Sequence, residues 1–433
     1  MNLLLCLLSI LLMPFAAAGL GLIQAGLGRS RSAAHALLTT VCALAVTSIV
    51  FVLLGSSWSG FAGGAAHAFT LHGVRWDWLG AEPLLARGVH FDGGGSNPSA
   101  NIAIGLVLCF EMFAVAIAAI IPIGAGTDRW RLLAFLASTA LFGAITWPLF
   151  SHWAWGGGWL SRVGTTFKLG AGFIDAGGSA AIHVVGGLTA LSLAWILGAR
   201  KGKYAGDGTA TAIPGHNIVV VLVGCILALV GWLGVNSAGS LLFYGAGAAR
   251  MAGIIVNTVL GASAASLAAL AMTRWRFGKP DASLIANGWV AGLVAGSAGC
   301  AFVAPGAAIG TGVIAGVLVV FSVDLLEQKL LIDDPGGAIS VHAVCGIWGV
   351  LAAGLFIGVA PGMRGAQILA QVVGIAALLG FILPLTYGLN WLLNRVVPQR
   401  VDRDGDWHGM DIRELGAGAY PEFVVHNDEF VPR

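Results

Sequence analysis

Two related stretches of sequence decide the fold: DAGGSAAIHVVGG at residues 175–187 and DPGGAISVHAVCG at residues 334–346. Both fit the pattern D-x-G-G-x4-H-x-V-x-G, and each begins a long apolar segment. Five predicted membrane spans lead from the first copy to the second. Because five is odd, the second copy must cross the bilayer in the opposite direction. This arrangement indicates an inverted repeat, whose functional site is expected near the middle of the membrane, where the repeats meet.

The composition around these copies is that of a membrane protein. Hydrophobic residues fill 58% of the 433 positions and charged residues only 10%, against roughly 25% charged residues in a typical soluble domain. These values exclude a disordered chain, a collagen and an ordinary cytosolic enzyme. We expect an all-α polytopic membrane protein with eleven transmembrane helices in a five-plus-five inverted repeat, since a span needs about 20 mostly apolar residues. The predicted spans are residues 2–26, 34–56, 100–125, 132–153, 177–199, 216–238, 250–272, 283–303, 307–326, 336–358 and 366–394.

The distribution of positive charge predicts the orientation. With the N-terminus outside, the inner loops and tail carry sixteen Lys and Arg residues and the outer segments carry six, which satisfies the positive-inside rule. The span 2–26 has no basic region before it and a longer apolar run than a signal peptide, so we expect a retained helix. The chain is predicted to lie in the cell (inner) membrane, with its C-terminus in the cytoplasm.

Two of the regions outside the spans are informative. The outer segment 57–99 is the longest loop, and its Trp76, Trp78 and glycines 93–95 indicate an ordered cover with interfacial aromatic residues. The tail changes composition abruptly to acidic and basic residues and is too short for a core of its own. We therefore expect a transmembrane domain at 1–394 and a cytoplasmic extension at 395–433.

Each copy of the repeat contains one histidine, His183 or His342, at a position where burial of an ionisable side chain is energetically unfavourable. Each follows the aspartate of its copy by eight residues, about 12 Å of helix rise, and so lies well inside the hydrocarbon, where an ionisable group must be paired or face a cavity. Two imidazoles meeting about a pseudo-twofold axis can share one N–H···N hydrogen bond while both stay neutral. Such a pair would line a narrow pore for a small polar molecule or a relayed proton. The alternative, that each histidine only satisfies a neighbouring carbonyl, is disfavoured by the duplication.

Three acidic residues are further candidates, each with a structural alternative. Asp175 and Asp334 stand at helix starts, where a carboxylate accepts backbone N–H groups and complements the helix dipole. Capping is the favoured role for Asp334, whereas Asp175, on the outer side, could also stabilise a cation above the pore. Glu111 lies within a span and should either recruit a cation or pair with a polar neighbour.

Trp155 lies at the outer end of the fourth span, in the segment HWAWGGG at 152–158. It is either an ordinary member of the interfacial aromatic belt or a cation–π wall of the outer vestibule, worth roughly 0.5–2 kcal/mol for a small cation. The sequence leaves both interpretations open.

The six cysteines give no sign of a cofactor. All lie in apolar stretches without a C-x-x-C pair, so neither a disulfide framework nor a thiolate metal site is expected. A site on His183 and His342 would leave zinc short of its three or four protein ligands. We expect no metal, no cofactor and no enzymatic activity.

Taken in order, the motifs resemble those of the Amt/Rh family of ammonium transporters over roughly residues 10–420. Beside the two copies, the resemblance rests on WGGG at 155–158, GWLGVN at 231–236, NT at 257–258, and GA at 124–125 with Arg129. It implies a homotrimer with one pore per subunit, moving ammonium or ammonia inward. It assigns His183 and His342 to the pore lining. It assigns Asp175 to recognition and deprotonation of ammonium, and Trp155 to the outer recruitment site. NH3 would then pass the imidazoles, and K+ would be excluded because it has no proton to lose.

The outer gate departs from the family pattern. The family usually carries two stacked phenylalanines there, and one of these positions is Val235, which cannot stack. The other is Phe113 if one residue is inserted in the helix, and Ala114 otherwise. The serine of the recruitment site falls on Ser240 only with an extra residue after Asn236. Two further interpretations therefore stay open: an ammonium sensor with weak flux, and a neutral channel for NH3 or CO2.

The tail resembles the ordered cytoplasmic end of the family at Gly409-Met410-Asp411 and Ala419-Tyr420. In the family this end typically couples subunits and meets PII-type signalling proteins. The resemblance thus implies a PII-type regulator at the cytoplasmic face, with an ordinary surface tail as the alternative.

Overall fold

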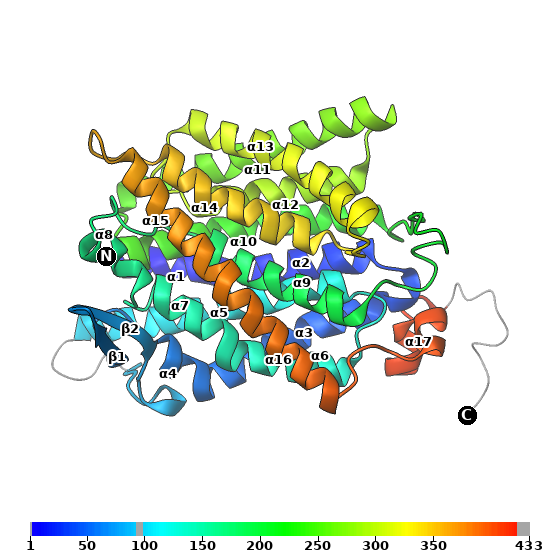
Figure 1. The fold of residues 1–433 in the computed structure, drawn as a ribbon, viewed down its shortest axis with the longest axis horizontal. Coiled ribbons are helices and arrows are strands. Elements are labelled where there is room, and N and C mark those ends of the chain that lie inside the picture. Colours follow the sequence, from blue (N-terminus) through cyan, green and yellow to red (C-terminus); the bar gives the residue numbers. More distant parts are fainter. Residues whose placement is uncertain (1, 92–97, 422–433) are drawn as a thin grey trace.

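The computed structural model describes residues 2–91 and 98–421, and its helices form a bundle (Figure 1). The α-helices are α1 (Leu3–Leu12), α2 (Pro14–Leu27), α3 (Ala33–Val50), α4 (Ser56–Ser59), α5 (Pro98–Gly126), α6 (Leu132–Leu141), α7 (Trp147–Ala154), α8 (Val163–Thr166), α9 (Val185–Leu197), α10 (Ile218–Tyr244), α11 (Met251–Phe277), α12 (Ala282–Ser297), α13 (Pro305–Asp324), α14 (Cys345–Phe356), α15 (Arg364–Ala377), α16 (Leu383–Val396) and α17 (Arg403–His408). Seven π-helical segments join or extend them: Phe51–Gly55, Phe142–Thr146, Ser179–Val184, Leu325–Lys329, Ile339–Val344, Leu378–Ile382 and Asp411–Leu415.

The predicted spans correspond closely to the helices. Within the described residues, ten helical segments are long and apolar enough to cross a membrane. The eighth predicted span, 283–303, is represented by α12, which has 16 residues and ends earlier because the chain turns at 298–302. The all-α membrane architecture is thereby confirmed, and the ten long helices together with α12 are consistent with eleven spans.

Small residues bring neighbouring helices close together. The long helix α10 packs along α2, and a Cβ at Gly231 would overlap the backbone of Ala16. In a bilayer the lipid is as apolar as the side chains, so helices associate through close packing of this kind. The closely packed interior leaves little room around the buried polar groups described below.

The hairpin of β1 (Ala66–Leu71) and β2 (Val74–Gly80) is the part of the fold that the all-α prediction missed. Its two-residue turn, 72–73, has φ values of 50° and 75°, the left-handed conformation typical of tight hairpins. Trp78 packs against Trp153 with ring centroids 4.7 Å apart, and Trp76 contacts the bundle in a similar way. The hairpin is thus an ordered cover, as its tryptophans predict; the glycines at 93–95 lie outside the described residues.

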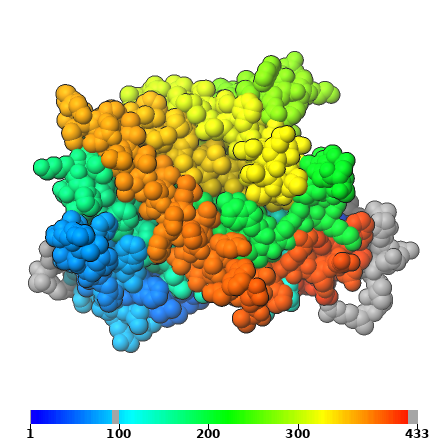
Figure 2. Space-filling view, in the orientation of Figure 1, coloured from blue at the N-terminus to red at the C-terminus, as the bar shows by residue number. Residues whose placement is uncertain are grey.

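The tail folds back against the end of the bundle opposite the hairpin (Figure 1). Asp411 caps α3: its Oδ1 accepts the N–H of His35 at 2.7 Å and its Oδ2 that of Ala34 at 3.1 Å. The ring of Trp407 lies 4.7 Å from the Nζ of Lys201, and Figure 2 shows the red tail against this green part of the chain. We call this end of the bundle the tail side and the other end the hairpin side.

Candidate functional site

The two histidines meet in the interior of the bundle. Nδ1 of His183 lies 3.3 Å from Nδ1 of His342, and the two residues are 1% and 4% exposed. Because a neutral imidazole has one donor and one acceptor nitrogen, the pair shares a single proton between these two atoms. The structure therefore brings together the two residues that the sequence repeat singles out.

The two copies of the repeat run in opposite directions through the bundle. At the start of the first, the backbone carbonyl of Asp175 accepts a hydrogen bond from Trp155 on the hairpin side. At the end of α9, the helix that continues from this copy, the carbonyl of Leu197 accepts one from Arg400 on the tail side. The second copy starts on the tail side, at Asp334. The two histidines consequently approach the middle of the bundle from opposite ends.

Each histidine lies in a π-helical turn, which sequence reasoning missed. The turns are Ser179–Val184 and Ile339–Val344. The N–H of His183 bonds to the carbonyl of Gly178, five residues before it. Such turns are rare and occur frequently at functional sites. The two π-helical turns therefore identify the site structurally, although no sequence pattern predicts them.

A row of unpartnered polar atoms continues from the histidines along α10. Trp232 stacks on His183, with ring centroids 4.9 Å apart and planes 5° from parallel. Three buried atoms of this row have no hydrogen-bond partner among the described residues: Nε2 of His183, Nε1 of Trp232 and Oδ1 of Asn236. The amide of Asn236 is held in place because its Nδ2 donates to Thr258 at 2.9 Å. A buried polar group without a partner is costly, so this row suits a small polar solute or water.

Asp175 is fully buried at the start of the first copy. Its carboxylate accepts the N–H groups of Ala180 at 3.1 Å and Ala181 at 2.8 Å, which is the capping role predicted for it. Burial raises the pKa of Asp175 to about 6, although the N–H groups of Ala181 and Ala180 act to lower it. The carboxylate thus faces its own helix, and the group it presents to Trp155 is its backbone carbonyl.

An aromatic cluster surrounds that carbonyl on the hairpin side. Trp155 stacks on Phe243, with centroids 4.7 Å apart and planes 3° from parallel. Phe110 packs edge-on against both, at 5.6 Å from Trp155 and 5.3 Å from Phe243. The faces and edges of these rings can hold a small cation by cation–π attraction. Sequence reasoning found Trp155 but neither Phe110 nor Phe243.

The predicted gate residues lie differently. Phe113 is half-buried against the apolar core, and among the described residues it makes no ring contact with Trp155; Phe110, three positions earlier on α5, does so instead. Val235 is buried at 2% exposure. Ser240 lies fully buried, with its hydroxyl 3.4 Å from the sulfur of Cys300. The phenylalanine of α5 that contacts Trp155 is therefore Phe110 and not Phe113.

Glu111 is paired with polar neighbours away from the aromatic cluster. Its Oε1 accepts the hydroxyls of Ser59 and Ser151, both at 2.7 Å, and the residue is 2% exposed. Of the two roles expected for Glu111, the contacts favour pairing over recruitment of a cation. The carbonyl of Ser59 in turn lies 2.9 Å from Nδ1 of His152, so Glu111 belongs to a buried polar cluster between helices.

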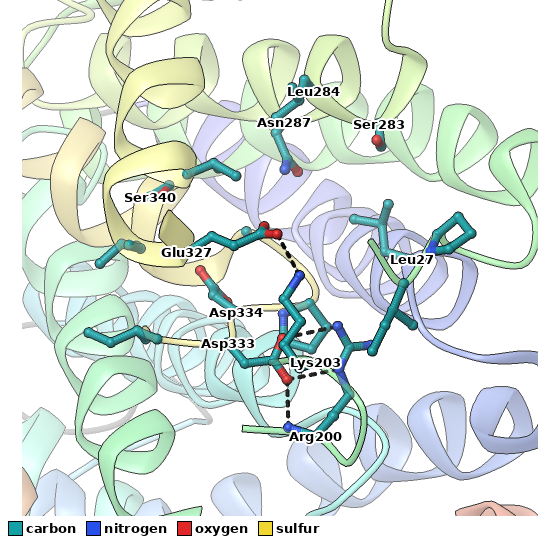
Figure 3. A pocket seen from close by; sticks show the side chains of 18 residues that line it. Leu27, Arg200, Lys203, Ser283, Leu284, Asn287, Glu327, Asp333, Asp334 and Ser340 are labelled. Atoms are coloured by element: carbon teal, nitrogen blue, oxygen red, sulfur yellow. Dashed lines mark hydrogen bonds and ion pairs between the residues drawn. The ribbon is translucent and has the colours of Figure 1, made fainter. Parts of the chain in front are cut away.

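Asp334 lines a cavity of about 130 Å³ on the tail side. Its carboxylate accepts the N–H groups of Ala338 at 3.0 Å and Ile339 at 2.7 Å, the capping role predicted for it. Figure 3 shows the cavity, with the ion pair of Lys203 and Glu327 across it; their Nζ and Oε1 atoms are 2.7 Å apart.

The aspartate next to it, Asp333, anchors an ion-pair network. Nε and Nη2 of Arg200 donate to its two oxygens at 2.9 and 3.0 Å. Burial alone would raise the pKa of Asp333, but Arg129 and Arg200 lower it to about 2. Arg200 also pairs with Asp128 at 2.9 Å. The network thus fixes the start of the second copy to the tail side of the bundle.

Comparison with known proteins gives a consistent result. The family model described as Ammonium Transporter Family matches residues 3–420. The chain is 33% identical to the ammonium transporter Amt2 of Archaeoglobus fulgidus, over 96% of this chain and 88% of that protein. It is 32% identical to an ammonium transporter of Bacillus subtilis, over 93% and 94%.

Solved structures share the fold. A structure titled Sensor Amt Protein matches with a TM-score of 0.84 and 27% identity, covering 95% of this chain and 98% of that one. Mep2 of Candida albicans matches with a TM-score of 0.77 and 22% identity, over 93% and 86%; at that identity the likeness concerns the fold alone.

Proposed function

The chain belongs to the ammonium transporter family, and on that premise we propose that it moves ammonium across the membrane along a path through the histidine pair. The observation that carries the proposal is the buried contact of 3.3 Å between Nδ1 of His183 and Nδ1 of His342. Two neutral imidazoles in a closely packed interior admit a small polar molecule and no large ion, because an ion would have to shed its water there.

On the hairpin side, NH4+ is recruited at the cluster of Trp155, Phe243 and Phe110. The ring faces attract the cation, and the backbone carbonyl of Asp175 can accept one of its N–H bonds. The ionised carboxylate of Asp175 adds a negative charge at the start of the path. Four of the residues predicted from sequence thus keep their proposed roles: Asp175, Trp155, His183 and His342. Phe110 and Phe243 take the place of Phe113 at the gate.

Beyond Asp175 the substrate travels as NH3. The N–H bond of NH4+ breaks near this residue, and NH3 passes the imidazoles while the proton follows through water and the shared proton of the histidine pair. The unpartnered polar atoms of Trp232 and Asn236 can form hydrogen bonds with NH3 or water along this path and so offset the loss of hydration. K+ is excluded because it has no proton to give up and cannot cross the pair as a neutral species.

We also propose the assembly and orientation that the family resemblance implies. These are a homotrimer in the cell membrane, the hairpin side outside, and the tail side in the cytoplasm. The excess of Lys and Arg on the tail side supports this orientation. We further propose a PII-type regulator at the cytoplasmic face, because the folded tail provides an ordered surface there for it to bind.

A second candidate function is ammonium sensing with weak flux. Two observations favour it: the likeness to a structure titled Sensor Amt Protein, and Val235 where the family usually has a stacking phenylalanine.

Electrophysiology on solid-supported membranes tests the proposal. Purified protein in liposomes receives pulses of ammonium, methylammonium and K+, and Asp175→Ala is compared with the wild type. We expect an ammonium current well above the K+ response, and its loss in the variant. Absence of current together with ammonia-dependent internal alkalinisation would mean a neutral channel. Saturable ammonium binding without either signal would favour the sensor.

A further inference from the structure

The cavity on the tail side carries a charge and a set of unpartnered polar groups that capping does not explain. Three acidic side chains line it, of which Asp333 and Glu327 are neutralised by the two basic ones, Arg200 and Lys203. Asp334 has no ion-pair partner among the described residues. Arg129 also pairs with Asp333, at 3.5 Å, but it does not line the cavity, so the lining side chains carry one more acid than base.

Two neutral groups in the cavity wall lack partners. The hydroxyl of Ser340 is fully buried and has no hydrogen bond among the described residues. The amide of Asn287 on α12 points into the cavity in Figure 3 and has none either. Gly337, with φ of 67°, makes room for this amide, because a Cβ there would overlap it. A hydroxyl and an amide oxygen beside a carboxylate that caps a helix but has no ion-pair partner are oxygen ligands of the kind that hold a monovalent cation.

A related arrangement occurs at the first copy of the repeat, at the first glycine of the turn instead of the second. There, a Cβ at Gly177 would overlap the amide of Asn236, whose Oδ1 is also unpartnered. Each D-x-G-G turn is therefore faced by an asparagine from a neighbouring helix, at a place that glycine keeps open. The likeness places an aspartate, a glycine turn and an asparagine at both ends of the path.

We propose that this cavity is a second ammonium site, on the tail side of the histidine pair, formed by Asp334, Ser340 and Asn287. Its volume of about 130 Å³ exceeds the 10–15 Å³ that one water requires, so the cation enters with part of its hydration. Ser340 lies two residues before His342 in the same π-helical turn, which places the site directly after the pair. The identity of the cation rests on the proposed function. The site itself rests on the cavity.

Anomalous scattering from Rb+, an ion close to ammonium in size, tests the site without any transport step. Crystals of the full chain are soaked in a concentration series of RbCl. We expect a peak in the cavity within coordinating distance of Asp334 and Ser340, and its loss in Asp334→Asn. Ser340→Ala should weaken binding about tenfold, and it leaves the fold intact because the hydroxyl has no partner to lose.

Ser192→Ala is the matched control, because the hydroxyl of Ser192 bonds to the carbonyl of Leu188 within α9, away from the cavity. It should leave the peak unchanged. A peak that is absent from the wild type, or equally strong in Asp334→Asn and Ser340→Ala, overturns the second site. A wild-type protein that conducts ammonium without the peak refutes this inference alone. A peak without conduction refutes the proposed transport alone.

Discussion

The indole N–H of Trp155 donates to the backbone carbonyl of Asp175 across 2.9 Å. The aromatic cluster and the buried aspartate are thus held at a fixed separation, although they lie on different segments of the chain. A substitution of Trp155 therefore affects both the ring that attracts a cation and the donor that holds the carbonyl of residue 175.

The two functions of Trp155 can be separated by substitution. Trp155→Phe keeps a ring against Phe243 and loses the N–H donor, whereas Trp155→Leu loses both. We expect the Michaelis constant of the ammonium current to rise about 3-fold in the first and about 10-fold in the second, since a cation–π contact is worth roughly 0.5–2 kcal/mol and 1.4 kcal/mol is tenfold. Trp195→Leu, at an exposed position of α9, is the control. Equal constants in all three variants would contradict the recruitment role.

The ammonium current should depend on pH on the hairpin side. Burial raises the pKa of Asp175 to about 6, so the carboxyl is mostly neutral at pH 5 and mostly ionised at pH 7. Because only the ionised form attracts a cation, the current at constant ammonium should rise over this interval, with a midpoint near pH 6. Asp175→Asn should give a small current without this rise. A wild-type current that falls from pH 5 to 7 would exclude the carboxylate as the attracting group.

Phe110 rather than Phe113 should set the affinity at the gate. Phe110→Leu removes a ring that packs against both Trp155 and Phe243, and we expect its Michaelis constant to rise about 3- to 10-fold, on the energy of one cation–π contact. Phe113→Leu, on the same helix, should change it less than 2-fold. Concentration series of the ammonium current measure both. The reverse order would restore the assignment made from the sequence.

Glu111 should matter for stability through its hydrogen bonds and little through its charge. Glu111→Gln keeps an acceptor for Ser59 and Ser151, and we expect its melting temperature in detergent to stay near that of the wild type. In Glu111→Leu the two hydroxyls can still bond to each other, at 3.2 Å, but one of them is left without an acceptor. An unsatisfied buried group costs about 1–3 kcal/mol, so the melting temperature should fall. Loss of transport in Glu111→Gln with unchanged melting would show that the charge itself is needed.

Asp333 should make the fold sensitive to acid. Its pKa is lowered to about 2 in the folded chain, against about 3.9 in an unfolded one. Its stabilising effect is therefore complete above about pH 4 and is lost as the pH falls through 2. Asp333→Asn should melt earlier at pH 7 and lose less on going from pH 5 to 3 than the wild type does. Asp404→Asn, on the exposed face of α17, should follow the wild type at every pH.

The sequence sufficed for the spans and for the histidine pair, and the reasons are physical. Spans follow from the length of apolar runs, which the bilayer fixes. The pair follows from a costly residue repeated within a pattern. His183 and His342 could thus be found without any knowledge of contacts.

The remaining features depend on packing that no local pattern encodes. The hairpin 66–80 lies in a loop whose alternating signal is weak, and π-helical turns have no residue signature. Phe243 lies eight positions after Val235 on α10 and contacts Trp155 only because three segments converge. Nothing in the sequence of α12 distinguishes Asn287, because its role depends on the contact of its amide with Gly337 in the folded chain.

The cap that Asp411 provides to α3 has a consequence for biogenesis. The hydrogen bond from His35 to this aspartate joins residues separated by 376 positions, and a ribosome makes the chain from its N-terminus. The helix α3 is therefore synthesised long before its cap. The docking of Asp411 onto α3 can only follow the synthesis of all the membrane segments between these two residues.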